Sequence, residues 1–180
     1  MGIPSATSSH SRPHKRFQIR LHRVANIDIA QLKHKGISGI ILDLDNTIVS
    51  EDDQYVSPFA EDWIKTAQKE GLKLFLLSNG KRKHRADYWS RRLQMPAISP
   101  AHKPRPKSFR LALRHMELHP HEVVVVGDSF HTDVCGAWMI GSSSIQICSL
   151  PHPPRWWEAL VGRWLQQRDP DPDSLWRFEA

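Results

Sequence analysis

Apolar residues along the chain gather into short runs that amphipathic stretches separate. Four runs are mostly apolar, as is typical of strands buried on both faces, and they span residues 37–44, 72–77, 123–126 and 144–148. Stretches of helical character alternate with them at 58–70, 82–93, 106–118 and 132–140. This repeated alternation predicts an α/β domain in which helices cover both faces of a parallel sheet.

The first of these helices has the clearest signals. Its apolar residues recur on one helical face, at Phe59, Ala60, Trp63, Ile64 and Ala67. Ser57 is a suitable N-cap, Pro58 suits the first turn, and Gly71 can end the helix. We therefore expect a helix from Pro58 to about residue 70.

Residues able to do chemistry follow the predicted strands. Two carboxylates end the first run, a hydroxyl and an amide follow the second, and a carboxylate follows the third, with a lysine and a further acid nearby. These residues are Asp43, Asp45, Ser78, Asn79, Asp128, Lys103 and Asp133. Ligands of open parallel sheets bind beyond the carboxyl ends of the strands. The sequence therefore predicts that these side chains converge there.

A set of converging carboxylates favours a bound divalent cation. Carboxylates at low dielectric repel one another unless they share a cation. Mg²⁺ prefers oxygen ligands in near-octahedral geometry and bridges to substrate phosphate oxygens. Phosphoryl transfer also needs an in-line nucleophile, a proton donor and positive charge around the equatorial oxygens. The residues at the strand ends supply these parts, so Mg²⁺ and a phosphorylated substrate are expected.

Four motifs follow one another along the chain: LDLDNT at 42–47, LLSN at 76–79, Lys103, and GDSFHTD at 127–133. In this order they resemble the motifs of the haloacid dehalogenase superfamily of phosphatases. More closely, DLDNTIV, AHKPRPKSF and VVVVGDSFHTDV are similar to segments of the YqeG-type bacterial phosphatases. Those proteins are related to mitochondrial and plastid phosphatidylglycerophosphate phosphatases. The resemblance implies a three-layer α/β/α, Rossmann-like domain with a parallel central sheet.

The resemblance also implies catalytic roles for three residues. Asp43 would be the nucleophile, and Asp45 would protonate the leaving oxygen and later act as the base for water. Lys103 would neutralise charge on Asp43 and on the phosphoryl group. An acid at position 45 favours phosphatase chemistry, because superfamily members that cleave carbon–halogen bonds lack it.

The resemblance also implies residues that bind phosphate and metal. The phosphate-binding residues would be Thr47, Ser78, Asn79 and Lys103. The metal-binding residues would be Asp43, Asp45 through its carbonyl, Asp128 and Asp133, of which Asp133 would orient Lys103 or a metal-bound water. Ser129 is a lesser candidate.

The spacing of the motifs bears on the kind of substrate. The residues between 47 and 78 are largely used by the predicted helix, and the segment from 79 to 103 is similarly short. Neither segment can house a cap domain, so an open site is expected. An open site suits a phosphate on a large molecule, such as a lipid head group, a nucleic-acid end or a phosphoprotein, since small metabolites would be less shielded from water.

Charge is unevenly distributed along the chain. The formal net charge is +6, and residues 1–27 contain five basic residues and no acid. We expect residues 1–23 to form a basic, disordered tail, or alternatively an organelle transit peptide. The phosphatase domain would span 24–168, with a second tail at 169–180. The expected location is the cytoplasm, with peripheral contact to the inner membrane face, or an organelle if the tail is a transit peptide.

Two segments could contact a membrane. Basic residues cluster after the LLSN motif, at Lys81, Arg82, Lys83, His84, Arg85, Arg91 and Arg92. They would attract an anionic surface or form an ordinary solvated face. Near the C-terminus, an apolar stripe at helical spacing comprises Trp156, Trp157, Leu160, Val161, Trp164 and Leu165. This amphipathic helix would lie at a lipid–water interface or pack on the core.

These observations favour hydrolysis of phosphatidylglycerophosphate to phosphatidylglycerol. The closest resemblance and the basic, tryptophan-rich periphery agree on a lipid head group as partner. One alternative is a phosphatase of soluble phosphoesters or of nucleic-acid 3′ ends, although nucleic acid is the less favoured partner. Another is a binding module that keeps the fold without catalysis. The sequence leaves the oligomeric state open.

Overall fold

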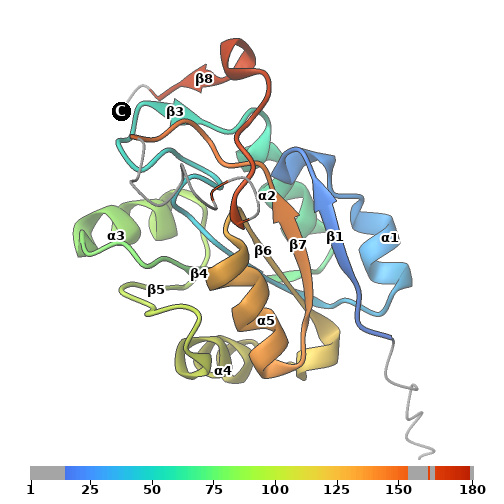
Figure 1. Cartoon of the computed structure of the whole chain (residues 1–180). Coiled ribbons are helices and arrows are strands. Elements are labelled where there is room, and N and C mark those ends of the chain that lie inside the picture. The colour runs from blue at the N-terminus through green and yellow to red at the C-terminus, as the bar shows by residue number, and fades with distance from the viewer. Residues whose placement is uncertain (1–14, 154–161, 163–164, 179–180) are drawn as a thin grey trace, which may run out of the picture.

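The computed structural model describes residues 15–153, 162 and 165–178 of the chain, and Figure 1 shows how its elements are arranged. A central parallel sheet lies between two layers of helices. None of the described helices is both long and apolar enough to span a membrane.

Six parallel strands form the central sheet, in the spatial order β1-β7-β6-β2-β4-β5. Their bounds are Gln18–Leu21 (β1), Gly39–Leu42 (β2), Lys73–Leu77 (β4), Ala97–Ile98 (β5), Val123–Gly127 (β6) and Ser143–Ile147 (β7). The chain runs from β2 outward to β4 and β5, then returns to the other side of β2 for β6 and β7. The direction of winding therefore reverses at β2, where a doubly wound sheet opens a crevice for ligands.

Helices cover both faces of the sheet, as predicted. On one face lie α1 (Ile29–His34), α2 (Ala60–Lys69) and α3 (Lys83–Arg92). On the other lie α4 (Pro106–Met116) and α5 (Cys135–Ile140). Short helical turns complete the fold at Val24–Asn26 (η1), Pro120–Glu122 (η2), Phe130–Val134 (η3, a π-helix) and Pro172–Ser174 (η5).

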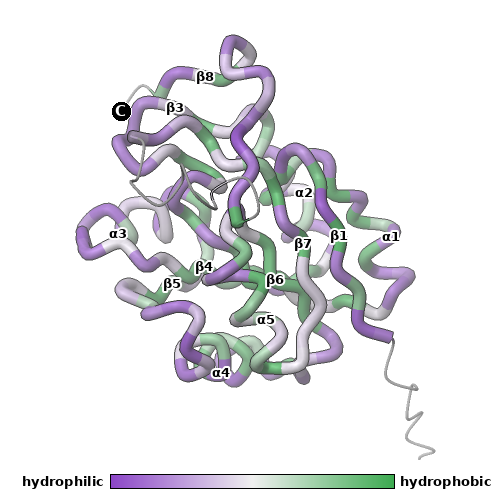
Figure 2. Tube along the Cα trace, viewed as in Figure 1, coloured by the Kyte–Doolittle hydropathy of each residue, from purple (hydrophilic) through white to green (hydrophobic). Residues whose placement is uncertain are grey.

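Strand side chains alternate between two hydrophobic cores. In β2, Ile40 packs with α2 on one face, whereas Ile41 packs with α4 on the other. Since successive side chains of a strand point to opposite faces, fully apolar strands serve both cores at once. Figure 2 shows hydrophobic residues along β6 and hydrophilic ones over α3.

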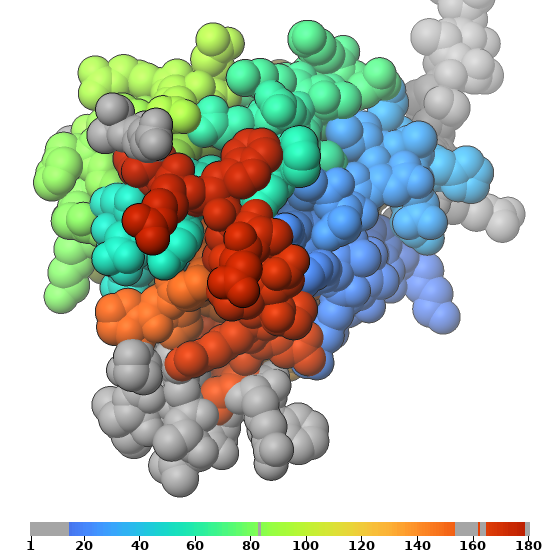
Figure 3. Space-filling model, turned by 90° about the horizontal axis from the view of Figure 1, so that it is seen from above, coloured from blue at the N-terminus to red at the C-terminus, as the bar shows by residue number. Residues whose placement is uncertain are grey.

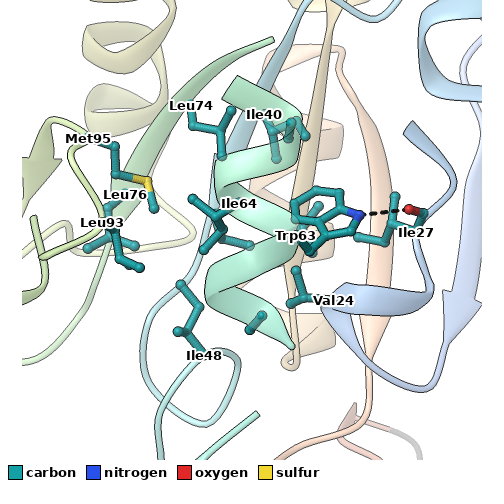
Figure 4. Packing of buried hydrophobic residues seen from close by; sticks show 14 of the residues in the cluster. Val24, Ile27, Ile40, Ile48, Trp63, Ile64, Leu74, Leu76, Leu93 and Met95 are labelled. Carbon is teal, nitrogen blue, oxygen red and sulfur yellow. Dashed lines mark hydrogen bonds between the residues drawn. The ribbon is translucent and has the colours of Figure 1, made fainter. Parts of the chain in front are cut away.

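Trp63 of α2 closes the first of these cores. Its ring lies among the buried residues of the sheet and of the N-terminal segment, and its Nε1 donates a hydrogen bond to the carbonyl oxygen of Ile27 at 2.8 Å (Figure 4). The helix itself starts later than predicted, at Ala60, and its N-cap is Phe59 in the left-handed conformation rather than Ser57. Its apolar face nevertheless matches the predicted one at Ala60, Trp63 and Ala67.

The predicted tails need correction at both ends. Residues 18–21 of the expected disordered tail form β1, which pairs in parallel with β7 at the edge of the sheet (Figure 1). In the expected tail at 169–180, β8 (Trp176–Arg177) pairs antiparallel with β3 (Tyr55–Val56). Figure 3, seen from above, shows this C-terminal segment on the surface at the end of the molecule toward which β1 and β7 point in Figure 1. Residues 1–14 lie outside the described part of the chain.

The other predicted strands and helices lie close to their predicted bounds, with one exception, whereas α1 and β5 were not predicted. The predicted helix at 132–140 begins with the π-helix η3 and continues as α5. The tryptophan-rich helix lies mostly outside the described residues; of its apolar stripe only Leu165 is described, and it is partly exposed. The segment from 43 to 59 contains turns and β3 alone, and no domain is inserted there.

Candidate active site

Most of the predicted site residues line one cavity at the carboxyl end of the sheet, and Thr47 and Asp133 lie behind its lining. Neighbouring strands β6, β2 and β4 end there, and each delivers a polar side chain. The cavity has a volume of about 440 Å³, and its lining includes Asp43, Asp45, Ser78, Asn79, Lys103, Asp128 and Ser129. The structure therefore brings together side chains that are far apart in the sequence.

Lys103 joins two carboxylates at the bottom of this cavity. Its Nζ donates hydrogen bonds to Asp43 Oδ1 at 2.5 Å and to Asp133 Oδ1 at 2.7 Å. Burial alone would lower the pKa of Lys103, but the carboxylates of Asp133 and Asp43 raise it above its ordinary value. The lysine is therefore a fixed positive charge beside Asp43.

Three carboxylates form a cluster that fits a metal ion. Asp43, Asp128 and Asp133 are all buried, and one oxygen of each lies within 4.8 Å of the others. We call these three residues and Lys103 the carboxylate site. Burial and the charge of Asp133 raise the pKa of Asp128 to about 6, and burial likewise raises the pKa of Asp43 well above its ordinary value.

The carboxylate site is not balanced in charge by its own residues. Lys103 balances one of three buried carboxylates, so the ionised cluster would carry a net charge of −2. A divalent cation would balance that charge, and hard oxygen ligands are those that Mg²⁺ prefers. The donor set therefore fits the expected metal. The Asp45 carboxylate is not part of the cluster, and the metal contact through its carbonyl stays a prediction.

Thr47 and Gly127 hold the carboxylate site in shape. Thr47 Oγ1 donates to Asp43 Oδ2 at 3.1 Å and accepts from the backbone nitrogen of Asp128 at 3.2 Å. It thus ties the loops after β2 and β6 together, and the expected contact of Thr47 with phosphate stays a prediction. A Cβ at Gly127 would lie 2.4 Å from Asp133 Cγ, so only glycine allows this carboxyl group to approach so closely.

Asp45 lies beside the carboxylate site with both of its oxygens engaged. Oδ2 accepts a hydrogen bond from Ser78 Oγ at 2.6 Å, and Oδ1 accepts one from Arg85 Nη1. A substrate phosphate would compete for both donors, because phosphate oxygens are strong acceptors for hydroxyl and guanidinium groups. Such competition would release an oxygen of Asp45 for proton transfer.

Asn79 and Ser129 have partners within the protein. Asn79 Nδ2 donates to the carbonyl of Lys103 at 3.1 Å, and its Oδ1 accepts from the Lys103 backbone nitrogen at 2.7 Å. The Ser129 backbone nitrogen donates to Asp133 Oδ2 at 3.2 Å, and its Oγ pairs with His131 Nδ1. Asn79 therefore positions the loop that carries Lys103, and phosphate contacts of Asn79 and Ser78 stay predictions.

Two residues of the cavity were missed as site residues at the sequence level. Arg85 of α3 is buried and bonded to Asp45, to Asp53 and to the Ser50 carbonyl. Gln166, from the C-terminal segment, donates through Nε2 to Asp128 Oδ2. Arg85 stood in a run of basic residues that gave no reason to single it out. No sequence signal marked Gln166.

Comparisons with known proteins identify the family whose motifs this chain resembles. A family model described as "Hydrolase: haloacid dehalogenase-like hydrolase" matches residues 16–137. The probable phosphatase YqeG of Bacillus subtilis (strain 168) is 36% identical over 124 residues, covering 69% of this chain and 72% of that protein. Both matches confirm the resemblance expected from the motifs.

Solved structures support the same fold. A HAD-like family hydrolase from Porphyromonas gingivalis aligns with a TM-score of 0.52 at 13% identity, covering 71% of this chain and 97% of that chain. A haloacid dehalogenase-like hydrolase from Brucella suis 1330 aligns with a TM-score of 0.52 at 11% identity, covering 67% and 92%. At these low sequence identities the structural similarity shows the fold alone.

Proposed function

This chain belongs to the haloacid dehalogenase-like hydrolases, and we propose that it hydrolyses a phosphate monoester through an aspartyl-phosphate on Asp43. One observation supports this proposal above the others: the Lys103 ammonium group bridges Asp43 and Asp133 within a buried carboxylate cluster. A carboxylate held beside a fixed cation, at the wall of a cavity, is suited to attack phosphorus.

Two displacements account for the reaction. A carboxylate oxygen of Asp43 attacks phosphorus, the ester P–O bond breaks, and Asp45 gives its proton to the leaving oxygen. Water then attacks the phosphorus of the aspartyl-phosphate, and Asp45 takes a proton from that water. The bond between Asp43 and phosphorus breaks, which restores the carboxylate and releases inorganic phosphate.

The residues around Asp43 have distinct tasks in both steps. Lys103 stays charged and stabilises the negative charge that gathers on the equatorial phosphoryl oxygens. Ser78 gives its hydroxyl to a phosphate oxygen and so leaves Asp45 Oδ2 free for the proton. Asp43, Asp128 and Asp133 would hold Mg²⁺, which supplies further positive charge toward the phosphoryl group when it is bound.

Phosphatidylglycerophosphate is the substrate that we propose. The support is the resemblance to YqeG-type proteins, the open cavity at the end of the sheet, and the basic residues at its rim, Lys81 and Arg82. An uncapped cavity can approach a phosphate that projects from a lipid surface, and basic residues near that surface are attracted by anionic lipid. Peripheral contact with such a membrane is part of the same proposal.

A phosphate-release assay with Mg²⁺ tests both the proposed phosphatase activity and the proposed lipid substrate. The panel contains phosphatidylglycerophosphate in mixed micelles, a sugar phosphate and a 3′-phosphorylated oligonucleotide. We expect release from the lipid at least about tenfold faster than from the others, which corresponds to about 1.4 kcal/mol of discrimination. Faster release from the oligonucleotide, with activity that falls steeply as salt is added, would mean that the substrate is a nucleic-acid end and not a lipid. No release from any compound would contradict phosphatase activity.

A further inference from the structure

A second cavity adjoins the active site, and none of the roles above uses it. Its volume is about 590 Å³, and three arginines and three aromatic residues line it: Arg82, Arg85, Arg91, Tyr88, Trp89 and Phe178. We call it the arginine cavity. Arg82 and Arg85 also line the cavity of the active site, so the two cavities are neighbours that share these two side chains.

Distant segments of the chain build the arginine cavity. Tyr88 and Trp89 come from α3, whereas Phe178 follows β8 at the other end of the chain. The backbone nitrogen of Phe178 donates to the Gln54 carbonyl at 2.9 Å, and its ring lies 5.3 Å from that of Trp89. Trp89 is almost fully buried, while Tyr88 is 39% exposed. The aromatic wall is therefore anchored at its base and open to a ligand at its rim.

The charges of the arginine cavity favour an anion. Asp53 is the one carboxylate among its lining residues, and it is bonded to Arg85 at 2.6 Å and to Arg82 at 3.1 Å; Arg85 is also paired with Asp45, so the three guanidinium groups outnumber the two carboxylates bonded to them. Arg91 is exposed, and no carboxylate among the described residues lies within ion-pair distance of it. A guanidinium group presents parallel N–H donors that match the oxygens of a phosphate.

Arg85 links this cavity to the chemistry. Its Nε bonds to Asp53 on the side of the arginine cavity, and its Nη1 bonds to Asp45 in the active site. Arg85 therefore lies between the two cavities, and a leaving group that extends from the scissile phosphate past Asp45 would pass this side chain to reach the arginine cavity.

We propose that the arginine cavity binds the leaving group of the substrate, and that this group carries a second anion, such as a phosphodiester, next to an apolar part. The inference rests on the proposed phosphatase function. The second anion pairs with Arg82 and Arg91, and the carbon chain beside it packs on Tyr88 and Phe178. This arrangement selects phosphate monoesters with an anionic alcohol over those with a neutral one.

Two soluble esters test the proposal. One is glycerol 1-phosphate, which has a neutral alcohol, and the other is glycerophosphoglycerol phosphate, whose alcohol carries a phosphodiester. We expect the KM of glycerophosphoglycerol phosphate to be about tenfold lower than that of glycerol 1-phosphate. Arg91→Gln or Phe178→Ala should each raise the KM of glycerophosphoglycerol phosphate to that of glycerol 1-phosphate, whose own KM should not change. Lys107→Gln, which removes an exposed charge from α4, is the matched control and should change neither KM.

Direct binding separates this inference from the catalytic proposal. Calorimetry with the Asp43→Asn variant measures the affinity of both esters without turnover, and we expect the phosphodiester-bearing ester to bind about tenfold more tightly unless Arg91 is also replaced. Equal affinities would overturn the arginine cavity as a subsite even if phosphate is released. Preferential binding without phosphate release by the unmodified chain would instead overturn the proposed function. The assays are repeated with phosphatidylglycerophosphate in micelles, the diacyl form of glycerophosphoglycerol phosphate. A lower KM for the micellar lipid shows that the substrate is used as a lipid, and a higher KM shows that it is used as a soluble compound.

Discussion

The carboxylate site and the arginine cavity are neighbours, yet they are built in opposite ways. In the carboxylate site every charged group is buried, and Lys103 connects Asp43 and Asp133 at 2.5 and 2.7 Å. In the arginine cavity, Arg82 has a half-exposed side chain and Arg91 is exposed. The charged groups of the carboxylate site are thus bonded to one another, whereas the arginine cavity has guanidinium N–H donors that are exposed to a ligand.

This difference suggests a division of labour between the two regions. Residues that transfer the phosphoryl group need fixed geometry, which short loops at the ends of buried strands provide. Residues that select the leaving group need only complementary charge and shape, which a surface helix and a C-terminal segment can supply. We therefore expect substitutions in the carboxylate site to lower activity on all substrates alike, and the effects of substitutions in the arginine cavity to depend on the substrate.

The largest expected effect comes from the nucleophile. Asp43→Asn should reduce phosphate release from every substrate by about 10⁴-fold or more, because an amide is a poor nucleophile. The same variant should keep its circular dichroism spectrum, since asparagine has nearly the shape of aspartate. Retained turnover would show that Asp43 does not form the intermediate.

Gly127→Ala should have the next largest effect. The new Cβ would lie 2.4 Å from Asp133 Cγ, so the carboxyl group has to move away from Lys103 and from the metal position. We expect the Mg²⁺ concentration needed for half-maximal activity to rise by about 10- to 100-fold. Gly141→Ala is the matched control: it should lower stability because of its φ of 81°, while leaving the metal dependence unchanged. Equal metal dependence of both variants would contradict this account of Gly127.

The sequence predicted the carboxylate site far better than the arginine cavity, for a physical reason. Asp43, Ser78 and Asp128 follow apolar runs, and strand ends of a parallel sheet must meet at one edge. Their convergence is thus a consequence of the fold class. Arg85 and Gln166 reach the same cavity through a surface helix and a C-terminal segment, whose positions no local pattern specifies.

The strands that were missed share a cause. β1 has the sequence QIRL, which is short, half polar and embedded in a basic stretch, and its residues are mostly exposed at the sheet edge. β3, β5 and β8 contain two residues each, too few to show a period. Their pairing depends on partners far away in the chain, as when Trp176 pairs with Val56. Tertiary contacts, rather than local preference, therefore define the edges of this domain.

A smaller effect on metal dependence is expected from Gln166→Ala. This side chain donates to Asp128 Oδ2 and to Ser149 Oγ, and so fixes the orientation of a predicted metal ligand. Its loss should raise the Mg²⁺ requirement by about tenfold, without changing the preference between the two glycerol esters. Gln167→Ala, at the exposed neighbouring position, should behave like the unmodified chain. A change in ester preference with an unchanged metal requirement would contradict this role.

The smallest effects should come from the contact that ties the C-terminal segment to the body. Asp169 accepts hydrogen bonds from Arg23 Nε at 2.9 Å and Nη2 at 3.1 Å, and its backbone nitrogen donates to the Ser149 carbonyl. Burial alone would raise the pKa of Asp169, but the bonds from Arg23 lower it below its ordinary value. A lowered pKa in the folded state means that the ionised carboxylate stabilises the fold.

Asp169→Asn should therefore reduce the free energy of unfolding by about 2 kcal/mol at pH 7, as measured by urea denaturation. The difference between the two chains should persist down to about pH 4 and shrink below it, since the contribution is lost as pH falls through the lowered pKa. Gln166 and Phe178 both belong to the segment that Asp169 anchors, and each serves a different cavity. Loosening this segment should therefore raise the Mg²⁺ concentration needed for half-maximal activity by a few-fold. It should also reduce the preference for the phosphodiester-bearing ester by a few-fold. A change in only one of them would mean that the two regions are positioned independently, although one segment of chain supplies both.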